Sequence, residues 1–156
     1  MNAVVRTARF DDLSGMLALY RELRPQDPAL SPDAARDAWA KMVSRDDIEV
    51  VVCEVDGTLA ATCMLATIPN LAAAAQPFGI IEHVITLASY RRRGLARRVL
   101  EHALASAWAH GCYKVMLLSG VQRAGAHALY EAAGFEGDVE RGFVARPRHF
   151  PAANPP

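Results

Sequence analysis

Three consecutive arginines, Arg91 to Arg93, stand directly before Gly94 and a segment with helical periodicity. The first turn of a helix has backbone N–H groups without intrahelical partners and carries the positive end of the helix dipole, so it attracts anions. Guanidinium groups add charge-assisted hydrogen bonds that suit phosphate oxygens. A glycine lets the backbone approach a ligand closely. This stretch therefore predicts a phosphate-binding turn, and its alternative is a solvated, charged loop.

Two further segments carry side chains that could transfer protons. Glu82 and His83 are adjacent in an apolar run at 79–87, where strand alternation predicts that only one of them lines a cleft. Tyr130 lies in a segment of helical periodicity at 123–133, and a phenol can protonate a leaving group in a dry site. The alternatives are a solvent-facing carboxylate for Glu82, a hydrogen-bonded structural imidazole for His83 and a core ring with a wet tip for Tyr130.

The elements that must position these residues alternate between strand and helix patterns. Asp56-Gly57 favours a tight type I′ hairpin turn, and Ser31-Pro32 is a typical N-cap followed by proline at the first helical position. The strand, helix and strand from 79 to 119 are long enough for a crossover within one sheet. An α/β fold with a mixed sheet is therefore expected. We expect strands at 3–8, on both sides of Asp56-Gly57, at 79–87 and at 113–119, a terminal strand pair from Phe135 to about Arg146, and helices from Asp11 or Asp12 to about Pro25, from Ser31 to about Ser44, from Gly94 to Gly111 and at 123–133.

Length and composition exclude several classes of protein. The 156 residues, 52% of them hydrophobic, predict one domain at 1–146 followed by a proline-rich tail at 147–156. Seventeen basic residues balance seventeen acidic ones, so no overall charge favours nucleic acid or an anionic membrane as a partner. The three cysteines Cys53, Cys63 and Cys112 lack the spacing of a zinc site or a disulfide framework. We expect no metal, no secretory leader or membrane segment, and a cytoplasmic location.

Two motifs resemble those of a known family. Arg91-x-x-Gly94-x-Ala96 resembles the (Q/R)-x-x-G-x-(G/A) motif of the GNAT superfamily of acyl-CoA-dependent N-acyltransferases, and ALYEAAGF at 128–135 resembles the family's later (A)-x-x-x-Y-E-x-x-G-F element. The motifs stand in the family's order, and the resemblance extends over nearly the whole chain. The succession of the segments IEHVIT, YRRRGLA, GCYKVMLL and LYEAAGF is most similar to the glucosamine-6-phosphate N-acetyltransferase branch.

The resemblance implies the GNAT fold, a mainly antiparallel central sheet flanked by helices, and acetyl-CoA as cosubstrate. It also implies that the backbone of Val84, Ile85 and Thr86 pairs with the pantetheine arm and polarises the thioester carbonyl. The loop whose N–H groups surround the coenzyme's pyrophosphate corresponds to Arg91, Arg92, Arg93, Gly94, Leu95, Ala96 and Arg97. Ala96 is small enough to keep the close backbone approach that the motif requires.

The resemblance also implies catalytic roles. Tyr130 matches the tyrosine near the coenzyme sulfur that is a proposed general acid for the departing thiolate. Glu82 matches an acidic position of the glucosamine-phosphate branch and is our candidate general base, while His83 replaces an aspartate of that segment. Ala126 stands where the branch has an asparagine, so one polar contact to the coenzyme is either absent or supplied by His127.

The expected reaction is direct attack of an amine on the thioester of acetyl-CoA in a ternary complex, with a small molecule such as an amino sugar as acceptor. Arg21, Arg24 and Gln26 could bind an anionic acceptor, although a solvated helix end is the commoner explanation. A protein or peptide amine acceptor and a catalytically silent acyl-CoA-binding regulatory module are the alternatives. Another nucleotide is disfavoured because the Gly-x-Gly-x-x-Gly and Gly-Lys-Ser/Thr patterns are absent. A homodimer is a family-level expectation.

Overall fold

The computed structural model describes residues 2–147 and divides the chain into two compact units, residues 1–117 and 118–156. The first unit contains the β-sheet with four of the five α-helices, and the second contains the remaining helix. The tail expected at 147–156 lies outside the described residues from residue 148 on. The single domain expected at 1–146 stays a prediction.

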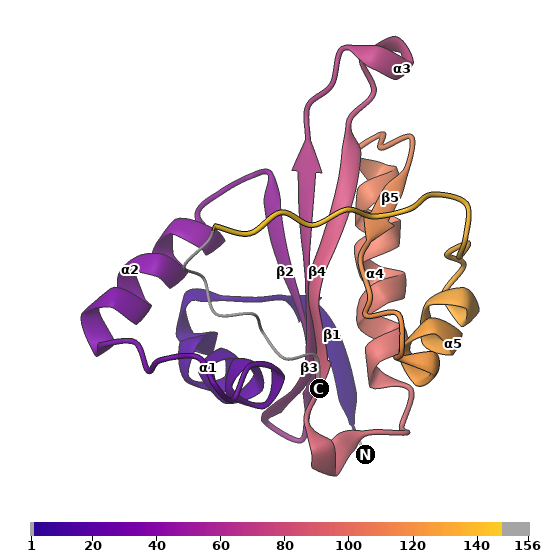
Figure 1. The fold of residues 1–156 in the computed structure, drawn as a ribbon. Coiled ribbons are helices and arrows are strands. Elements are labelled where there is room, and N and C mark those ends of the chain that lie inside the picture. Colours follow the sequence, from indigo (N-terminus) through magenta and orange to yellow (C-terminus); the bar gives the residue numbers. More distant parts are fainter. Residues whose placement is uncertain (1, 148–156) are drawn as a thin grey trace. The chain divides into compact units, whose positions relative to one another are not determined.

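Five strands form one sheet in the order β1-β2-β3-β4-β5. Strands β1 to β4 run antiparallel to their neighbours, whereas β5 runs parallel to β4, with Gly79 opposite Val115. The expected mixed, mainly antiparallel sheet is therefore confirmed (Figure 1). The strands are β1 Ala3–Thr7, β2 Ile48–Val55, β3 Thr58–Ile68, β4 Phe78–Thr86 and β5 Val115–Leu117.

Helices cover both faces of this sheet. In the first unit, α1 and α2 lie on one face and α4 on the other (Figure 1). Met16, Leu19 and Trp39 of α1 and α2 pack with Val50 and Val52 of β2 in one buried cluster, and the alternate residues of that strand point toward α4. The helices are α1 Leu13–Leu23, α2 Pro32–Val43, α3 Ala72–Ala75, α4 Leu95–Ala109 and α5 Ala124–Ala132, with 3-10 turns η1 Phe10–Asp12 and η2 Ala88–Tyr90. Within residues 2–147, no helix combines the length and apolar character needed to cross a membrane.

Local sequence signals account for several element boundaries. Asp56 and Gly57 both have positive φ, +47° and +83°, as a type I′ turn requires, so the predicted hairpin is confirmed. The Ser31 side chain accepts a hydrogen bond from the Ala34 N–H at 3.2 Å and caps α2 as predicted. Gly111, with φ +76°, follows the C-cap of α4 at the expected C′ position.

Other boundaries differ from the prediction. The terminal strand pair expected from Phe135 to Arg146 is wrong, because residues 135–146 contain no strand. This segment carries many charges, and its apolar side chains Val139, Phe143 and Val144 are exposed, so it has no apolar face to lay against a sheet. The β5 strand is also shorter than the predicted segment at 113–119. Helix α3 was not predicted.

A group of charged side chains ties β1 to the start of α1. The guanidinium of Arg6 donates two hydrogen bonds to the Asp12 carboxylate, at 2.7 and 2.9 Å, and two to Glu54 of β2, at 2.8 and 3.3 Å. Asp12 also accepts a hydrogen bond from the Arg9 N–H at 2.6 Å. The hydrogen bond from Arg6 lowers the pKa of the Asp12 carboxyl below its usual range.

We expect Arg6→Gln to lower the free energy of unfolding by about 1–3 kcal/mol, because a bidentate, partly buried pair is lost. Since the pKa of Asp12 is lower in the folded state, its contribution is present above about pH 4 and is lost as pH falls through the folded value. The difference between wild type and variant in urea denaturation should therefore shrink in acid. Arg36→Gln, which breaks the exposed pair of Arg36 with Asp33, should change stability by less than about 0.5 kcal/mol.

Candidate active site

The predicted phosphate-binding turn lies between the end of β4 and the start of α4. Gly94 is the N-cap of α4 and has φ +75°, a conformation that glycine adopts without strain. The Arg98 N–H donates to the Gly94 carbonyl at 3.2 Å and closes the first turn. The N–H groups of Leu95, Ala96 and Arg97 therefore precede the intrahelical ladder and are available to an anion. Leu95 is 1% exposed and anchors the turn in the core.

The arginine side chains divide into two groups. Arg91 donates through Nε to the Thr86 carbonyl at 3.3 Å, and Arg93 donates to the Ser89 carbonyl at 3.1 Å while lying over the Tyr90 ring. These two side chains help to build the turn, a role that the sequence did not reveal. Arg92 is exposed with φ +60°. Arg97 pairs with Glu101 at 2.7 Å along the surface of α4.

Glu22 connects α1 to the same turn. Its carboxylate accepts a hydrogen bond from the Ala88 N–H at 2.8 Å and lies 4.0 Å from the Arg91 guanidinium. No pattern in the sequence indicates this contact, because Glu22 and Ala88 are far apart in the chain. It fixes the start of the loop against α1, on the face of the sheet where the acceptor was expected.

Strand β4 contains a bulge at its centre. Glu82 pairs with Met64 and Ile85 with Thr62, so two residues of β4, His83 and Val84, stand where β3 has one. His83 has φ +56°, which is uncommon for a residue other than glycine. The extra residue changes which face of the sheet each later side chain occupies.

The bulge corrects the expected side-chain alternation. Because paired residues share a face, Glu82 and Ile85 lie on the face of α1 and α2, whereas Thr86 lies on the opposite face with its partner Ala61. Glu82 thus does not share a face with Thr86, although strict alternation along the strand would place both on one face. The His83 ring contacts the Tyr20 ring of α1, with centroids 5.4 Å apart, so both Glu82 and His83 face α1 and α2.

Among residues 2–147, no strand pairs with β4 on the side of β5 beyond Ile81. The last pair between these strands joins Ile81 to Leu117, and β4 continues to Thr86. Val84 and Thr86 are half-buried, Ile85 is 8% exposed, and the buried Thr86 hydroxyl has no hydrogen-bond partner within residues 2–147. Backbone groups on such an edge can pair with an extended ligand.

The later motif lies in the second unit. Tyr130 is 9% exposed in α5, and its ring meets Phe135 edge-on with centroids 6.2 Å apart. The His127 ring is within 2.8 Å of the Gly120 carbonyl, so it is engaged locally. Gly134, with φ +97°, ends the helix as predicted.

The cysteine thiols are poorly suited to nucleophilic catalysis. Cys53, Cys63 and Cys112 are buried, and burial raises the pKa of each, to about 12 for Cys63. A thiol with a raised pKa has little reactive thiolate at neutral pH. In residues 2–147 no group of three or more His, Cys, Asp or Glu side chains could hold a metal ion.

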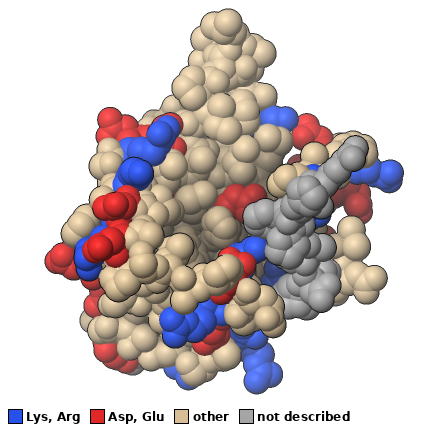
Figure 2. All heavy atoms as spheres, turned by 60° about the vertical axis from the view of Figure 1, so that its left-hand side comes forward, with Lys and Arg blue, Asp and Glu red and all other residues tan. Residues whose placement is uncertain are grey.

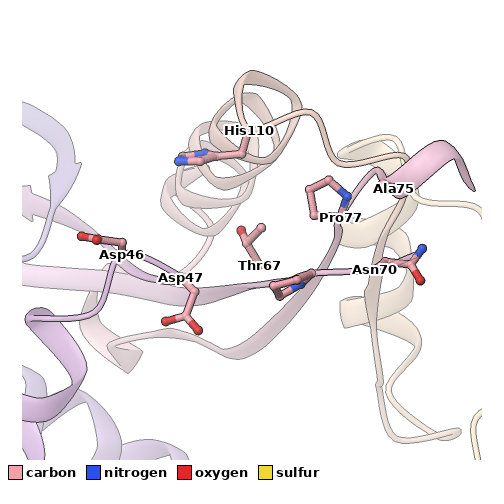
Figure 3. A pocket seen from close by; sticks show the side chains of 8 residues that line it. Asp46, Asp47, Thr67, Asn70, Ala75, Pro77 and His110 are labelled. Carbon is pink, nitrogen blue, oxygen red and sulfur yellow. The ribbon is translucent and has the colours of Figure 1, made fainter. Parts of the chain in front are cut away.

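A hollow of about 360 Å³ opens at the other end of β4, where Thr67, Pro77 and His110 face one another (Figure 3). Of its two acidic residues, Asp46 and Asp47, Asp47 already pairs with Arg45, and the His110 ring is 2.8 Å from the Ser106 carbonyl. None of the predicted site residues lines it. We therefore place the candidate site at the bulge and the arginine turn.

Charges on the face of α1 and α2 are mixed. Figure 2 shows basic and acidic side chains interspersed over this face, without a large patch of one sign. Arg24 illustrates the mixture, since its Nε donates to Asp27 at 2.6 Å. This surface gives no sign of a binding site for a large polyanion.

The sequence has relatives of known classification. The profile of the Acetyltransferase (GNAT) family matches residues 16–135. Glucosamine 6-phosphate N-acetyltransferase 1 of Oryza sativa subsp. japonica is 29% identical over 143 residues, covering 88% of this chain and 84% of the relative.

Solved structures share the fold. The "Putative acetyltransferase from Agrobacterium tumefaciens str. C58" is 40% identical, with a TM-score of 0.88 over 92% of this chain and 99% of that one. The aminoglycoside N-acetyltransferase AAC(6')-Iy, solved in complex with CoA, is 19% identical, with a TM-score of 0.79 over 94% of this chain and 95% of that one. The predicted fold class is thereby confirmed.

Proposed function

Because the chain belongs to the acetyltransferase (GNAT) family and is an acetyl-CoA-dependent N-acetyltransferase, we propose that it acetylates a primary amine of a small molecule, such as an amino sugar. One observation supports the location of this activity. The end of β4, which has no strand partner on the side of β5 within residues 2–147, is followed along the chain by the arginine turn. The extended pantetheine arm of the coenzyme could lie along the edge of β4, and its pyrophosphate could lie at the arginine turn.

We propose that the backbone of Val84, Ile85 and Thr86 holds the pantetheine arm and polarises the thioester carbonyl. The free edge of β4 supports this role. The pyrophosphate would bind at the start of α4, where N–H groups precede the helical ladder and Arg92 is exposed. The residues proposed for this turn are Arg91, Arg92, Arg93, Gly94, Leu95, Ala96 and Arg97.

The amine would attack the thioester directly. In the ternary complex its lone pair bonds to the carbonyl carbon, the C–S bond breaks, and the CoA thiolate leaves with that electron pair. The buried thiols with raised pKa values argue against an acyl-cysteine intermediate. Holding the two substrates together supplies much of the acceleration in reactions of this type.

Two residues are proposed for proton transfer. Tyr130 would protonate the departing thiolate, a role supported by its match to the family motif and by its burial. Glu82 is the proposed acidic group on the acceptor side, since its side chain is exposed on the face of α1 and α2. Its carboxylate would attract the acceptor's ammonium group and is our sequence-based candidate for the base.

The acceptor pocket would include the end of α1 and the segment after it. Arg24 is engaged by Asp27, so of the two arginines proposed for an anionic acceptor only Arg21 is uncommitted among the described residues. This arrangement favours recognition of the amine over recognition of a phosphate. A cytoplasmic location and a homodimer remain proposals.

A panel of amines tests this function. We expect thiol release from acetyl-CoA with at least one of glucosamine, glucosamine 6-phosphate, an aminoglycoside and spermidine, and none with a peptide that has a free N-terminus. Release with the peptide alone would favour the protein acetyltransferase alternative. Tight binding of acetyl-CoA without release for any amine would favour the regulatory module.

A further inference from the structure

His83 occupies an unusual backbone position on β4. Its φ of +56° places it in the left-handed region, and it is one of the two residues that form the bulge. A residue other than glycine in this region is strained, and it is retained where the surrounding structure holds it. The bulge breaks the strict alternation of side chains along β4, so the imidazole faces α1.

The surroundings of this ring differ from those of a structural histidine. Nδ1 of His83 is buried, and no hydrogen-bond partner for it exists among the described residues. Most buried polar atoms in proteins are hydrogen-bonded, so an unpartnered one requires an explanation. The sequence-based alternative of a hydrogen-bonded structural imidazole is therefore not supported.

Charged and titratable groups reach this ring from two sides. Tyr20 of α1 packs against it, and burial raises the pKa of the Tyr20 phenol to about 12, so this phenol stays protonated at neutral pH. Asp27, after α1, is held ionised mainly by its hydrogen bond from Arg24, and the charge of His83 lowers its pKa further. Glu82 precedes His83 on β4 and faces the same side.

We propose that His83, in place of the sequence-based candidate Glu82, is the proton acceptor for the acceptor amine, which deepens the proposed function and rests on it. Neutral His83, in the tautomer that carries its hydrogen on Nδ1, takes a proton at Nε2 from the bound ammonium group, directly or through one water molecule. The amine lone pair thus freed attacks the thioester carbonyl carbon. The second amine proton leaves as the C–S bond breaks and balances the proton that the thiolate acquires, and the imidazolium returns its proton to solvent. Glu82 then binds and orients the ammonium group.

Replacements at His83 can separate this role from a structural one. Asparagine and aspartate tolerate positive φ better than most residues, so His83→Asn removes the titratable ring with little cost to the bulge. His83→Asp provides a different proton acceptor at the same place. His110→Asn is the matched control, because His110 lies at the hollow near the other end of β4.

The measurement is the pH dependence of kcat/KM with the amine that the wild-type protein acetylates fastest. Imidazole groups lose their proton between about pH 5 and 8, so the wild-type profile should rise through that range. We expect His83→Asn to lower kcat/KM about 100-fold. The pH profile of this variant should follow only the fraction of the amine that is neutral. His83→Asp should recover part of the activity with its rise moved toward about pH 4, where carboxylates titrate. His110→Asn should match wild type.

The outcomes distinguish this inference from the proposed function. Retention of the neutral-range rise in His83→Asn, with its loss in Glu82→Gln, would assign the base to Glu82 and overturn the role of His83. Equal loss of activity in His83→Asn and His83→Asp, without a change in the profile, would mean a purely structural role. Absence of wild-type turnover with every amine would contradict the proposed function, and the role of His83 would fall with it.

Discussion

Gly94→Ala is expected to weaken CoA binding by about 10- to 100-fold while leaving the protein folded. A Cβ at this position would meet no protein atom within 4 Å, so the side chain itself causes no clash in the free protein. It would instead occupy the space into which the pyrophosphate must come to reach the N–H groups at the start of α4. Loss of one charge-assisted hydrogen bond, worth about 1.5–3 kcal/mol, gives the expected size. Isothermal titration with CoA measures it.

Gly57→Ala is the matched control for the backbone strain that the Gly94→Ala substitution introduces. Gly57 has φ +83° in the hairpin turn, and a Cβ there also meets nothing within 4 Å. Both variants should lose about 1–2 kcal/mol of stability, since each forces alanine into the left-handed region. Only Gly94→Ala should lose affinity for CoA. Equal affinities of the two variants would remove the arginine turn from the binding site.

Tyr130→Phe is expected to lower kcat about 100-fold with little change in the affinity for acetyl-CoA. The ring is 9% exposed and packs against Phe135, so phenylalanine keeps the packing and loses only the hydroxyl group. A proton donor positioned at a leaving group typically contributes a factor of this size or more. Steady-state kinetics with saturating amine, together with a binding titration, separates the two quantities.

The control for this prediction is Tyr113→Phe. Tyr113 is 42% exposed before β5, with the Lys114 ammonium group over its ring, and we assign it no role in catalysis. Removal of the Tyr113 hydroxyl group should leave kcat unchanged. If Tyr130→Phe also keeps the wild-type kcat, the thiolate acquires its proton from another source.

Local signals in the sequence were sufficient for the elements that flank the site. Asp56-Gly57 has a backbone requirement that few other dipeptides meet, and Ser31-Pro32 specifies a helix start through a cap that lies within one turn. The position of the arginine turn was equally readable, because Gly94 and the apolar periodicity of α4 lie next to each other in the chain. These features depend on contacts between neighbouring residues.

Features that depend on contacts between residues far apart in the chain could not be predicted from the sequence. The bulge at His83 arises from pairing with β3, and no residue type at 82–84 identifies it. It reversed the expected relation between Glu82 and Thr86 and brought His83 to the acceptor side. The contact of Glu22 with Ala88 and Arg91 joins segments far apart in the sequence. The segment after Phe135 has strand-like apolar residues, but the structure offers them no strand partner.

Direct transfer of the acetyl group is the central claim, and the fate of a labelled acetyl group tests it. Wild-type protein is mixed with acetyl-CoA labelled in the acetyl group, with and without the accepted amine, and free CoA, labelled protein and labelled amine are quantified over time. We predict that CoA appears only when the amine is present, with one N-acetylated amine for each CoA released and no label on the protein. A burst of CoA before the amine is added, with label retained on the protein, would contradict direct transfer.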